Sequence, residues 1–140
     1  MKIMHVADVH VESAYIKPGK QKSALLRDES VQRFADIVAE AKKQKVDVVL
    51  ICGDLFDRTV VRKSTIKFVL DQIAQNKDIR FFYCLGNHDH KLLFDGEIPK
   101  NLTIFPTNFE KYDLGEVVIG GNSVRKYSRA EFAKQGDFCL

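Results

Sequence analysis

The chain has 140 residues, with 22 basic and 19 acidic side chains and a formal net charge of +3. This length accommodates a single domain, and the mild positive charge permits nucleic-acid binding without indicating it, because a dedicated nucleic-acid binder usually carries a clustered basic face. No apolar run reaches the ~20 residues that a transmembrane helix requires, so we expect no association with a membrane.

The cysteines and the start of the chain indicate the compartment. Cys52, Cys84 and Cys139 form no C-x-x-C pair of the kind that marks zinc or redox sites. Cys52 and Cys84 fall within apolar runs, where a free cysteine behaves as a small hydrophobic residue. The first apolar run turns polar at Asp8, which is not the pattern of a signal peptide. We therefore expect a reduced, cytoplasmic protein.

Apolar periodicity predicts alternating strands and helices in the first part of the chain. Residues 3–7, 46–52 and 80–85 are short, β-branched or aromatic runs, which are typical of buried parallel strands. Apolar residues at helical spacing predict helices over residues 28–44 and 62–75. Each helix connects two strands, so the chain is expected to begin as a parallel βαβαβ unit with right-handed crossovers.

The starts of the two helices are marked differently. Asp28 and Glu29 suit the positive end of the first helix dipole, so we place the start of that helix there. The second helix has two candidate capping residues, Thr59 and Ser64, and the sequence does not decide between them.

The remainder of the chain gives weaker signals. Residues 103–105 predict a short strand, and residues 109–112 and 117–120 can pair as a hairpin. Residues 123–140 show no firm pattern, although residues 129–135 can form one or two helical turns.

Polar side chains follow each of the three strong apolar runs where the predicted strand ends. They form the segments Asp8-Val9-His10, Gly53-Asp54-Leu55-Phe56-Asp57 and Gly86-Asn87-His88-Asp89. Parallel strands bring their carboxyl ends to one edge of a sheet, so these side chains are expected to meet there. In an extended stretch Asp8 and His10 point the same way and can reach one ion. Such oxygen and imidazole donors suit divalent metals such as Mn, Fe or Zn.

A simpler interpretation is that the acidic residues only cap the helices that follow, as aspartate often does. For Asp57 or Asp89 taken alone, the two interpretations are equally good. Helix capping does not account for histidine and asparagine at matching strand ends, so the whole set favours a functional site.

D-x-H, then G-D-x-x-D, then G-N-H-D, each after a strand, resemble the calcineurin-like metallophosphoesterase superfamily. The wider context, residues 5–10 followed by residues 53–57, most resembles its SbcD-like DNA-repair exonuclease branch. The resemblance implies an α/β metallophosphoesterase-type sandwich of two sheets with helices outside, in which the parallel βαβαβ unit is the beginning.

The resemblance also implies a role for each polar residue. Asp8 and His10 would hold one metal ion, Asn87 would hold a second through its amide oxygen, and Asp54 would bridge the two. A water molecule between the ions would attack the phosphorus in line. His88 would be catalytic, facing the substrate to stabilise developing charge or to protonate the leaving group.

The neighbouring residues would have supporting roles. Asp57 and Asp89 would accept hydrogen bonds that fix His88 or its loop. We expect His5 to be a core or supporting residue, and His90 to be a loop residue, with a substitute ligand as the alternative. Two divalent ions are expected in the full family site, with Mn first and Fe, Zn or Mg as alternatives.

The sequence departs from the family pattern in its histidines. The family site uses further histidines downstream, whereas the four histidines here are His5, His10, His88 and His90. The resemblance also implies a domain larger than the 140 residues of this chain. We therefore expect residues 1–140 to be a single, truncated metallophosphoesterase domain whose second sheet is incomplete.

The leading functional hypothesis is a metal-dependent phosphoesterase, namely a DNA exonuclease or phosphodiesterase related to double-strand-break repair nucleases. The resemblance implies DNA, a second copy of the chain and an SMC-like coiled-coil ATPase as partners. Two alternatives stay open. One is a small-substrate phosphatase or cyclic-nucleotide phosphodiesterase that uses the same site, because a fold does not determine a substrate. The other is a catalytically incomplete fragment that acts as a binding module.

Overall fold

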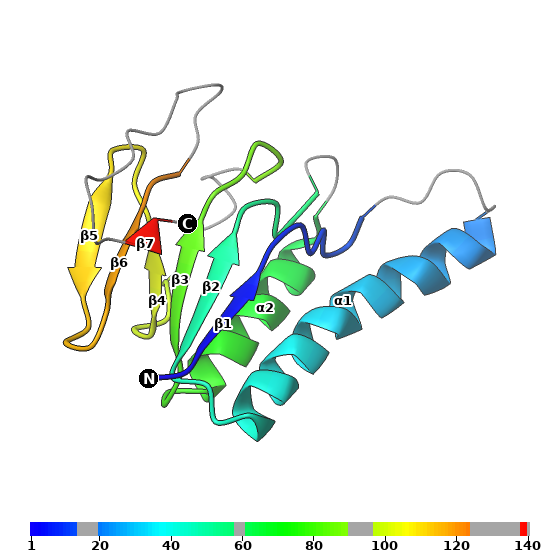
Figure 1. Cartoon of the computed structure of the whole chain (residues 1–140). Coiled ribbons are helices and arrows are strands. Elements are labelled where there is room, and N and C mark those ends of the chain that lie inside the picture. Colours follow the sequence, from blue (N-terminus) through cyan, green and yellow to red (C-terminus); the bar gives the residue numbers. More distant parts are fainter. Residues whose placement is uncertain (14–19, 58–60, 90–96, 124–137, 140) are drawn as a thin grey trace.

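The structure, a computed structural model, describes residues 1–13, 20–57, 61–89, 97–123 and 138–139. These residues form three layers, with two helices on one face of a four-stranded sheet and a smaller sheet on its other face (Figure 1). Neither helix in this part of the chain combines the length and the apolar character needed to cross a membrane.

The larger sheet is wholly parallel, with its strands in the order β1-β2-β3-β4. Its strands are β1 (Ile3–Val6), β2 (Val48–Cys52), β3 (Arg80–Cys84) and β4 (Leu102–Ile104). The predicted parallel βαβαβ beginning and the short fourth strand are therefore confirmed. The prediction that all three leading strands are buried is wrong for β1, which lies at the edge of the sheet and leaves Ile3 40% exposed.

The first helix, α1 (Lys20–Lys43), begins eight residues before the predicted start at Asp28. The first turn of α1 contains no acidic residue, so Asp28 and Glu29 lie in its interior and do not mark its beginning. The physical reason is propensity: the residues from Lys20 to Arg27 include lysine, glutamine, alanine, leucine and arginine, and neither glycine nor proline.

The second helix, α2 (Lys63–Gln75), closely matches its predicted range. Arg62 is the residue that precedes it, in an extended conformation and without a side-chain capping hydrogen bond. Ser64 lies inside the helix, so it is not the cap, and Thr59 lies outside the described residues.

The larger sheet contributes side chains to two apolar layers. Val49 and Ile51 of β2 pack toward the helices, where Phe34 of α1 and Val69 of α2 are also buried. Alternate residues of the same strand, such as Leu50, pack toward the smaller sheet. Both faces of β2 are thus covered, which explains why its sequence is continuously apolar rather than alternating.

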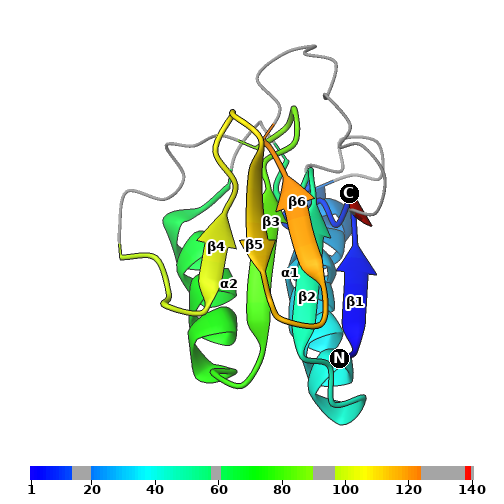
Figure 2. The ribbon, with the colours of Figure 1, turned by 60° about the vertical axis from the view of Figure 1, so that its left-hand side comes forward.

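The smaller sheet is built on a hairpin that the sequence predicted. Strands β5 (Glu110–Asp113) and β6 (Val118–Gly121) are antiparallel, and β7 (Phe138–Cys139) pairs with β6 in parallel. Figure 2 shows this hairpin in front of β2 and β3, and Ile119 packs there against the layer that includes Leu50 and Phe82. The helical turns predicted for residues 129–135 lie outside the described residues.

Candidate metal centre

Three loops meet at the carboxyl end of the larger sheet: the first loop (residues 7–13), the second loop (residues 53–57) and the third loop (residues 85–89). The first loop continues alongside the second after β1 and β2 have ended. The backbone N–H of His10 donates to the carbonyl of Asp54 at 3.0 Å. Beyond it, a short parallel bridge joins Val11 to Phe56. The two loops are therefore held side by side by backbone hydrogen bonds.

This arrangement brings three metal-binding side chains together. Ligand atoms of Asp8, His10 and Asp54 all lie within 4.8 Å of one another. Nε2 of His10 is 4.0 Å from Oδ1 of Asp8, and the Asp8 side chain is 73% exposed, so the group is open to solvent. Two carboxylates and an imidazole are donors that fit a divalent ion.

The backbone that brings Asp8 and His10 together differs from the extended stretch that the sequence led us to expect. Their φ angles are 51° and 48°, which lie in the left-handed region, so the alternation of side chains along an extended chain does not explain their proximity. Glu12 and Asp54 also have positive φ, at 63° and 49°. Strained backbone of this kind tends to gather at functional sites.

Two glycines allow the second and third loops to approach each other. Gly53 has a φ of +80°, a conformation that few other residues adopt. A Cβ atom on Gly86 would lie 2.2 Å from Oδ1 of Asp54, so no larger residue fits there. That same oxygen accepts a hydrogen bond from the backbone N–H of His88 at 2.9 Å. The third loop is thus tied directly to a candidate ligand.

Asp89 ties the same two loops together from another position. Its carboxylate accepts hydrogen bonds from the backbone N–H groups of Gly86 at 2.8 Å and Phe56 at 2.9 Å. Asn87 lies between Gly86 and His88, and the backbone N–H groups of both neighbours are bonded. Hydrogen bonds on both sides of Asn87 therefore hold the backbone around it in place.

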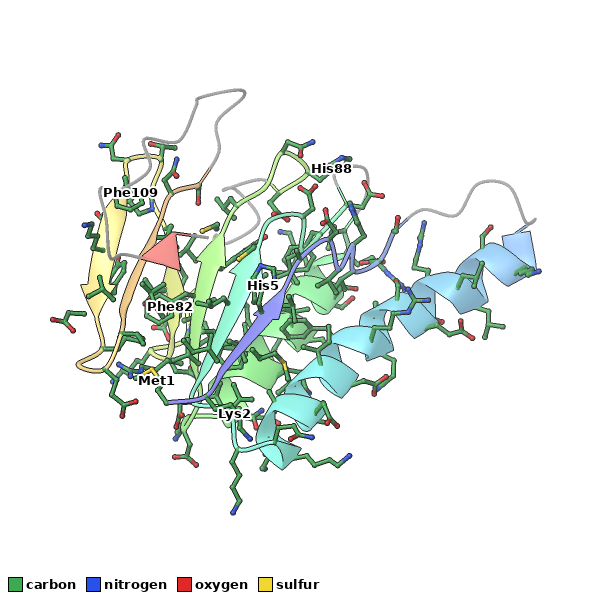
Figure 3. All side chains as sticks on the ribbon, viewed as in Figure 1. Met1, Lys2, His5, Phe82, His88 and Phe109 are labelled. Carbon is green, nitrogen blue, oxygen red and sulfur yellow. The ribbon has the colours of Figure 1, made fainter. Side chains whose placement is uncertain are left out.

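His88 lies on the loop after β3, at the same end of the sheet as the candidate ligands (Figure 3). Its ring stands edge-on to that of His10, with the ring centroids 5.3 Å apart. Nδ1 of His88 is buried and lies 3.5 Å from Oδ1 of Asp57, which is longer than an ordinary hydrogen bond. The other carboxylate oxygen of Asp57 accepts a hydrogen bond from the Ser13 hydroxyl at 2.7 Å.

Two carboxylates beside the centre have lowered pKa values. The hydrogen bond from Ser13 lowers the pKa of Asp57 and outweighs the effect of burial. Burial alone would raise the pKa of Glu12, but hydrogen bonds from Thr65 and Arg62 bring it below its usual range. Both carboxylates are therefore negatively charged at neutral pH.

Other residues stand apart from this group. His5 lies within β1, paired with Leu50, and is not among the clustered ligands of the described residues (Figure 3). It is exposed, so the expectation of a core histidine is wrong, because β1 is an edge strand. His90 lies outside the described residues. Glu12 and Ser13 were not predicted as site residues, because single polar residues in an irregular stretch carry no periodic signal. Their position two and three residues after D-x-H was the only indication.

Comparison with known proteins identifies the family. The sequence matches the calcineurin-like phosphoesterase family over residues 1–136. The chain belongs to this family. Its parallel sheet with a second, smaller sheet agrees with the predicted metallophosphoesterase-type α/β fold. The family comprises hydrolases that act on ester bonds and use divalent metals, which the Asp8, His10 and Asp54 donor set fits.

Individual relatives are similar to part of the chain. It is 25% identical over 91 residues to the DNA double-strand break repair protein Mre11 of Methanopyrus kandleri. It is 32% identical over 92 residues to the DNA double-strand break repair protein Mre11 of Archaeoglobus fulgidus. Each match covers 64% of this chain and 19% of the relative, so the chain spans about a fifth of the length of these relatives.

Proposed function

We propose that this chain is a metal-dependent phosphoesterase that hydrolyses phosphodiester bonds of DNA as an exonuclease. The observation that carries the proposal is the convergence of Asp8, His10 and Asp54 within 4.8 Å, beside the ring of His88. The choice of DNA as substrate is supported by the relatives, which are named as DNA double-strand break repair proteins.

In this proposal Asp8, His10 and Asp54 hold a divalent ion, and Asn87 contributes to a second site that shares Asp54. Mn²⁺ is the metal we propose, and Fe, Zn or Mg ions can use similar donors. A bound divalent ion polarises the phosphoryl oxygen and lowers the pKa of a coordinated water. The protein's task is to fix these side chains where a phosphodiester can approach from solvent.

His88 acts on the substrate in this proposal. Its Nδ1 is buried against Asp57, so Nε2 is the nitrogen left to face a phosphodiester. From there it stabilises the charge that develops on the phosphoryl group or donates a proton to the leaving oxygen. Asp57, fixed by Ser13, orients the ring, and Asp89 holds the loop that carries it.

The proposal extends to the setting of the enzyme. By the resemblance described above, we propose a cytoplasmic protein that acts as a homodimer together with an SMC-like coiled-coil ATPase.

The test is hydrolysis of bis-p-nitrophenyl phosphate by the purified chain with added Mn²⁺, beside Asp54→Asn and His88→Ala. We expect turnover in the wild type and a loss of several orders of magnitude in both variants. His88→Ala should still bind Mn²⁺, whereas Asp54→Asn should bind it weakly, because of these two residues Asp54 is the proposed metal ligand. A folded wild type that binds Mn²⁺ without turnover would reject the catalytic proposal.

A second candidate is a non-catalytic binding module. It is favoured by the small donor set, since three ligand side chains gather in the described part of the chain and the sequence has no histidine after His90. Metal binding without hydrolysis would support it. Among active proteins, DNA affinity that falls steeply with salt indicates a nuclease, while turnover of free nucleotides without DNA affinity indicates a small-substrate enzyme.

A further inference from the structure

Glu12 follows the candidate ligand His10 by two residues, and its side chain is completely buried. A buried carboxylate persists only where it is paired and hydrogen-bonded. Glu12 forms an ion pair with the guanidinium of Arg62, and it also accepts a hydrogen bond from the backbone N–H of Arg62 at 2.8 Å. Fifty residues of sequence separate the two partners, so the pair connects distant parts of the chain.

The pair joins the first loop to both helices. The backbone N–H of Glu12 donates to the hydroxyl of Ser30 at 2.9 Å, and Ser30 is a buried residue of α1. Arg62 directly precedes α2, and its guanidinium also reaches Asp28 of α1 at 3.4 Å. Loop and helices therefore share one polar network in which the charge of Glu12 is central.

The network acts on the backbone that carries the metal ligands. Asp8, His10 and Glu12 occupy every second position of the first loop, and all three have positive φ. Such a conformation persists only when the surroundings fix it. The backbone hydrogen bond from His10 to Asp54 holds the first loop against the second loop. The ion pair between the buried carboxylate of Glu12 and Arg62 holds it against the start of α2.

We propose that the Glu12–Arg62 pair is a positioning clamp that holds the first loop in its strained conformation and so preorganises Asp8 and His10 for metal binding. The inference rests on the proposed metal centre and concerns residues outside the ligand set. Residues that orient metal ligands typically change metal affinity or activity by about 10- to 100-fold when replaced.

The test is Mn²⁺ affinity measured by isothermal titration calorimetry, with the melting temperature of each variant recorded in EDTA. We expect Arg62→Met to weaken Mn²⁺ binding by about 10- to 100-fold. The matched control is Lys67→Met, which breaks the exposed Lys67–Asp71 pair of α2, 2.6 Å long, and should leave Mn²⁺ affinity unchanged. A variant that melts earlier but binds Mn²⁺ like the wild type would show that the pair only stabilises the fold.

Arg62→Met leaves the buried carboxylate of Glu12 without its positively charged partner, so a second variant guards against unfolding. In Glu12→Gln/Arg62→Met neither partner is charged, and removing both members of a buried pair is usually tolerated better than removing one. We expect this double variant to fold and to bind Mn²⁺ weakly, and Arg62→Lys to recover part of the affinity. Wild-type affinity in the folded double variant would overturn the clamp.

The calorimetric readout separates this inference from the proposed function. Weak Mn²⁺ binding in the clamp variants, with no hydrolysis by a wild type that binds Mn²⁺, would reject the enzyme and retain the clamp. Hydrolysis by the wild type, with unchanged Mn²⁺ affinity in the variants, would support the enzyme and reject the clamp. A wild type that binds no Mn²⁺ would overturn the metal centre and the clamp together.

Discussion

The two ends of the parallel sheet use their polar residues in different ways. At the amino end, Asp47 accepts a hydrogen bond from the backbone N–H of Lys2 at 2.6 Å, and the side-chain amide of Asn101 donates to carbonyls at the end of α2. At the carboxyl end, Asp8 and Asp54 bring like charges within 4.8 Å of one another on strained backbone. Polar residues satisfy backbone groups at both ends, but only the carboxyl end also gathers like charges that repel each other.

This contrast separates stability from function. Polar residues at the amino end remove unpaired backbone groups, which stabilises the fold. The carboxyl end has left-handed φ angles at four residues that are not glycine, namely Asp8, His10, Glu12 and Asp54. Conformations of this kind cost on the order of 1–3 kcal/mol each. A region that destabilises the free protein, yet collects donors for a divalent ion, is expected to gain most when the ion binds.

The largest expected effect on stability comes from supplying that ion. At 100 times its dissociation constant, Mn²⁺ should raise the free energy of unfolding by about 2.7 kcal/mol, and EDTA should abolish the gain. Asp8→Asn should unfold in EDTA no more easily than the wild type, because it relieves repulsion, and should gain little from Mn²⁺. Urea unfolding with and without Mn²⁺ measures both effects.

The matched control for Asp8→Asn is Asp47→Asn at the amino end. It weakens the hydrogen bond from Lys2 and should lower stability slightly, while the gain from Mn²⁺ stays at the wild-type value. Equal Mn²⁺ stabilisation of Asp8→Asn and the wild type would mean that the ion binds elsewhere.

The contribution of the amino end to stability can be tested by replacing Asn101. Its Nδ2 atom donates to the carbonyls of Ile73 at 2.8 Å, Asn76 at 3.0 Å and Ile79 at 3.1 Å. Asn101→Ala should lower the free energy of unfolding by about 1 kcal/mol, because three partly buried carbonyls lose a donor while those of Ile73 and Asn76 keep a backbone N–H. Mn²⁺ affinity and turnover per folded molecule should not change.

Asn101→Asp is the companion variant for the amino end. It replaces the donor with a carboxylate that faces three carbonyl oxygens, so it should lose more stability than Asn101→Ala. Urea unfolding of the two variants gives the ranking. A fall in Mn²⁺ affinity in either variant would contradict the separation of the two ends.

The sequence predicted the regular parts of the molecule because they follow periodic rules. The continuous apolar run of β2 and the helical spacing of α2 have few alternatives, and the order of strands and helices follows from them. The start of α1 was misplaced because Asp28 and Glu29 resemble a helix beginning, while the residues before them are equally good helix formers. Local charge is therefore weaker evidence for a helix boundary than a real interruption.

The sequence predicted that three candidate ligands lie close together, but not the backbone conformation that brings them there. Strand ends indicated that Asp8, His10 and Asp54 meet, because topology brings the ends of parallel strands together. The left-handed backbone of the first loop and the contact between Glu12 and Arg62 were not predicted. Such features depend on pairings between distant residues, which leave no periodic pattern in one sequence.

The layer between the two sheets can be tested at Cys84, which is partly buried there. Burial, with a contribution from Cys52, raises the pKa of Cys84 to about 12. In the unfolded chain this thiol ionises near its ordinary pKa of about 9, so between these values the folded state binds more protons. The contribution of Cys84 to stability is therefore complete below about pH 8 and declines as the pH rises toward 12. One such proton accounts for at most about 1.4 kcal/mol per pH unit.

Urea unfolding at pH 8 and pH 10 should show a smaller loss of unfolding free energy for Cys84→Ala than for the wild type. Equal losses would mean that the thiol is solvated in the folded protein, and that the layer between the sheets is as open to water as the carboxyl end.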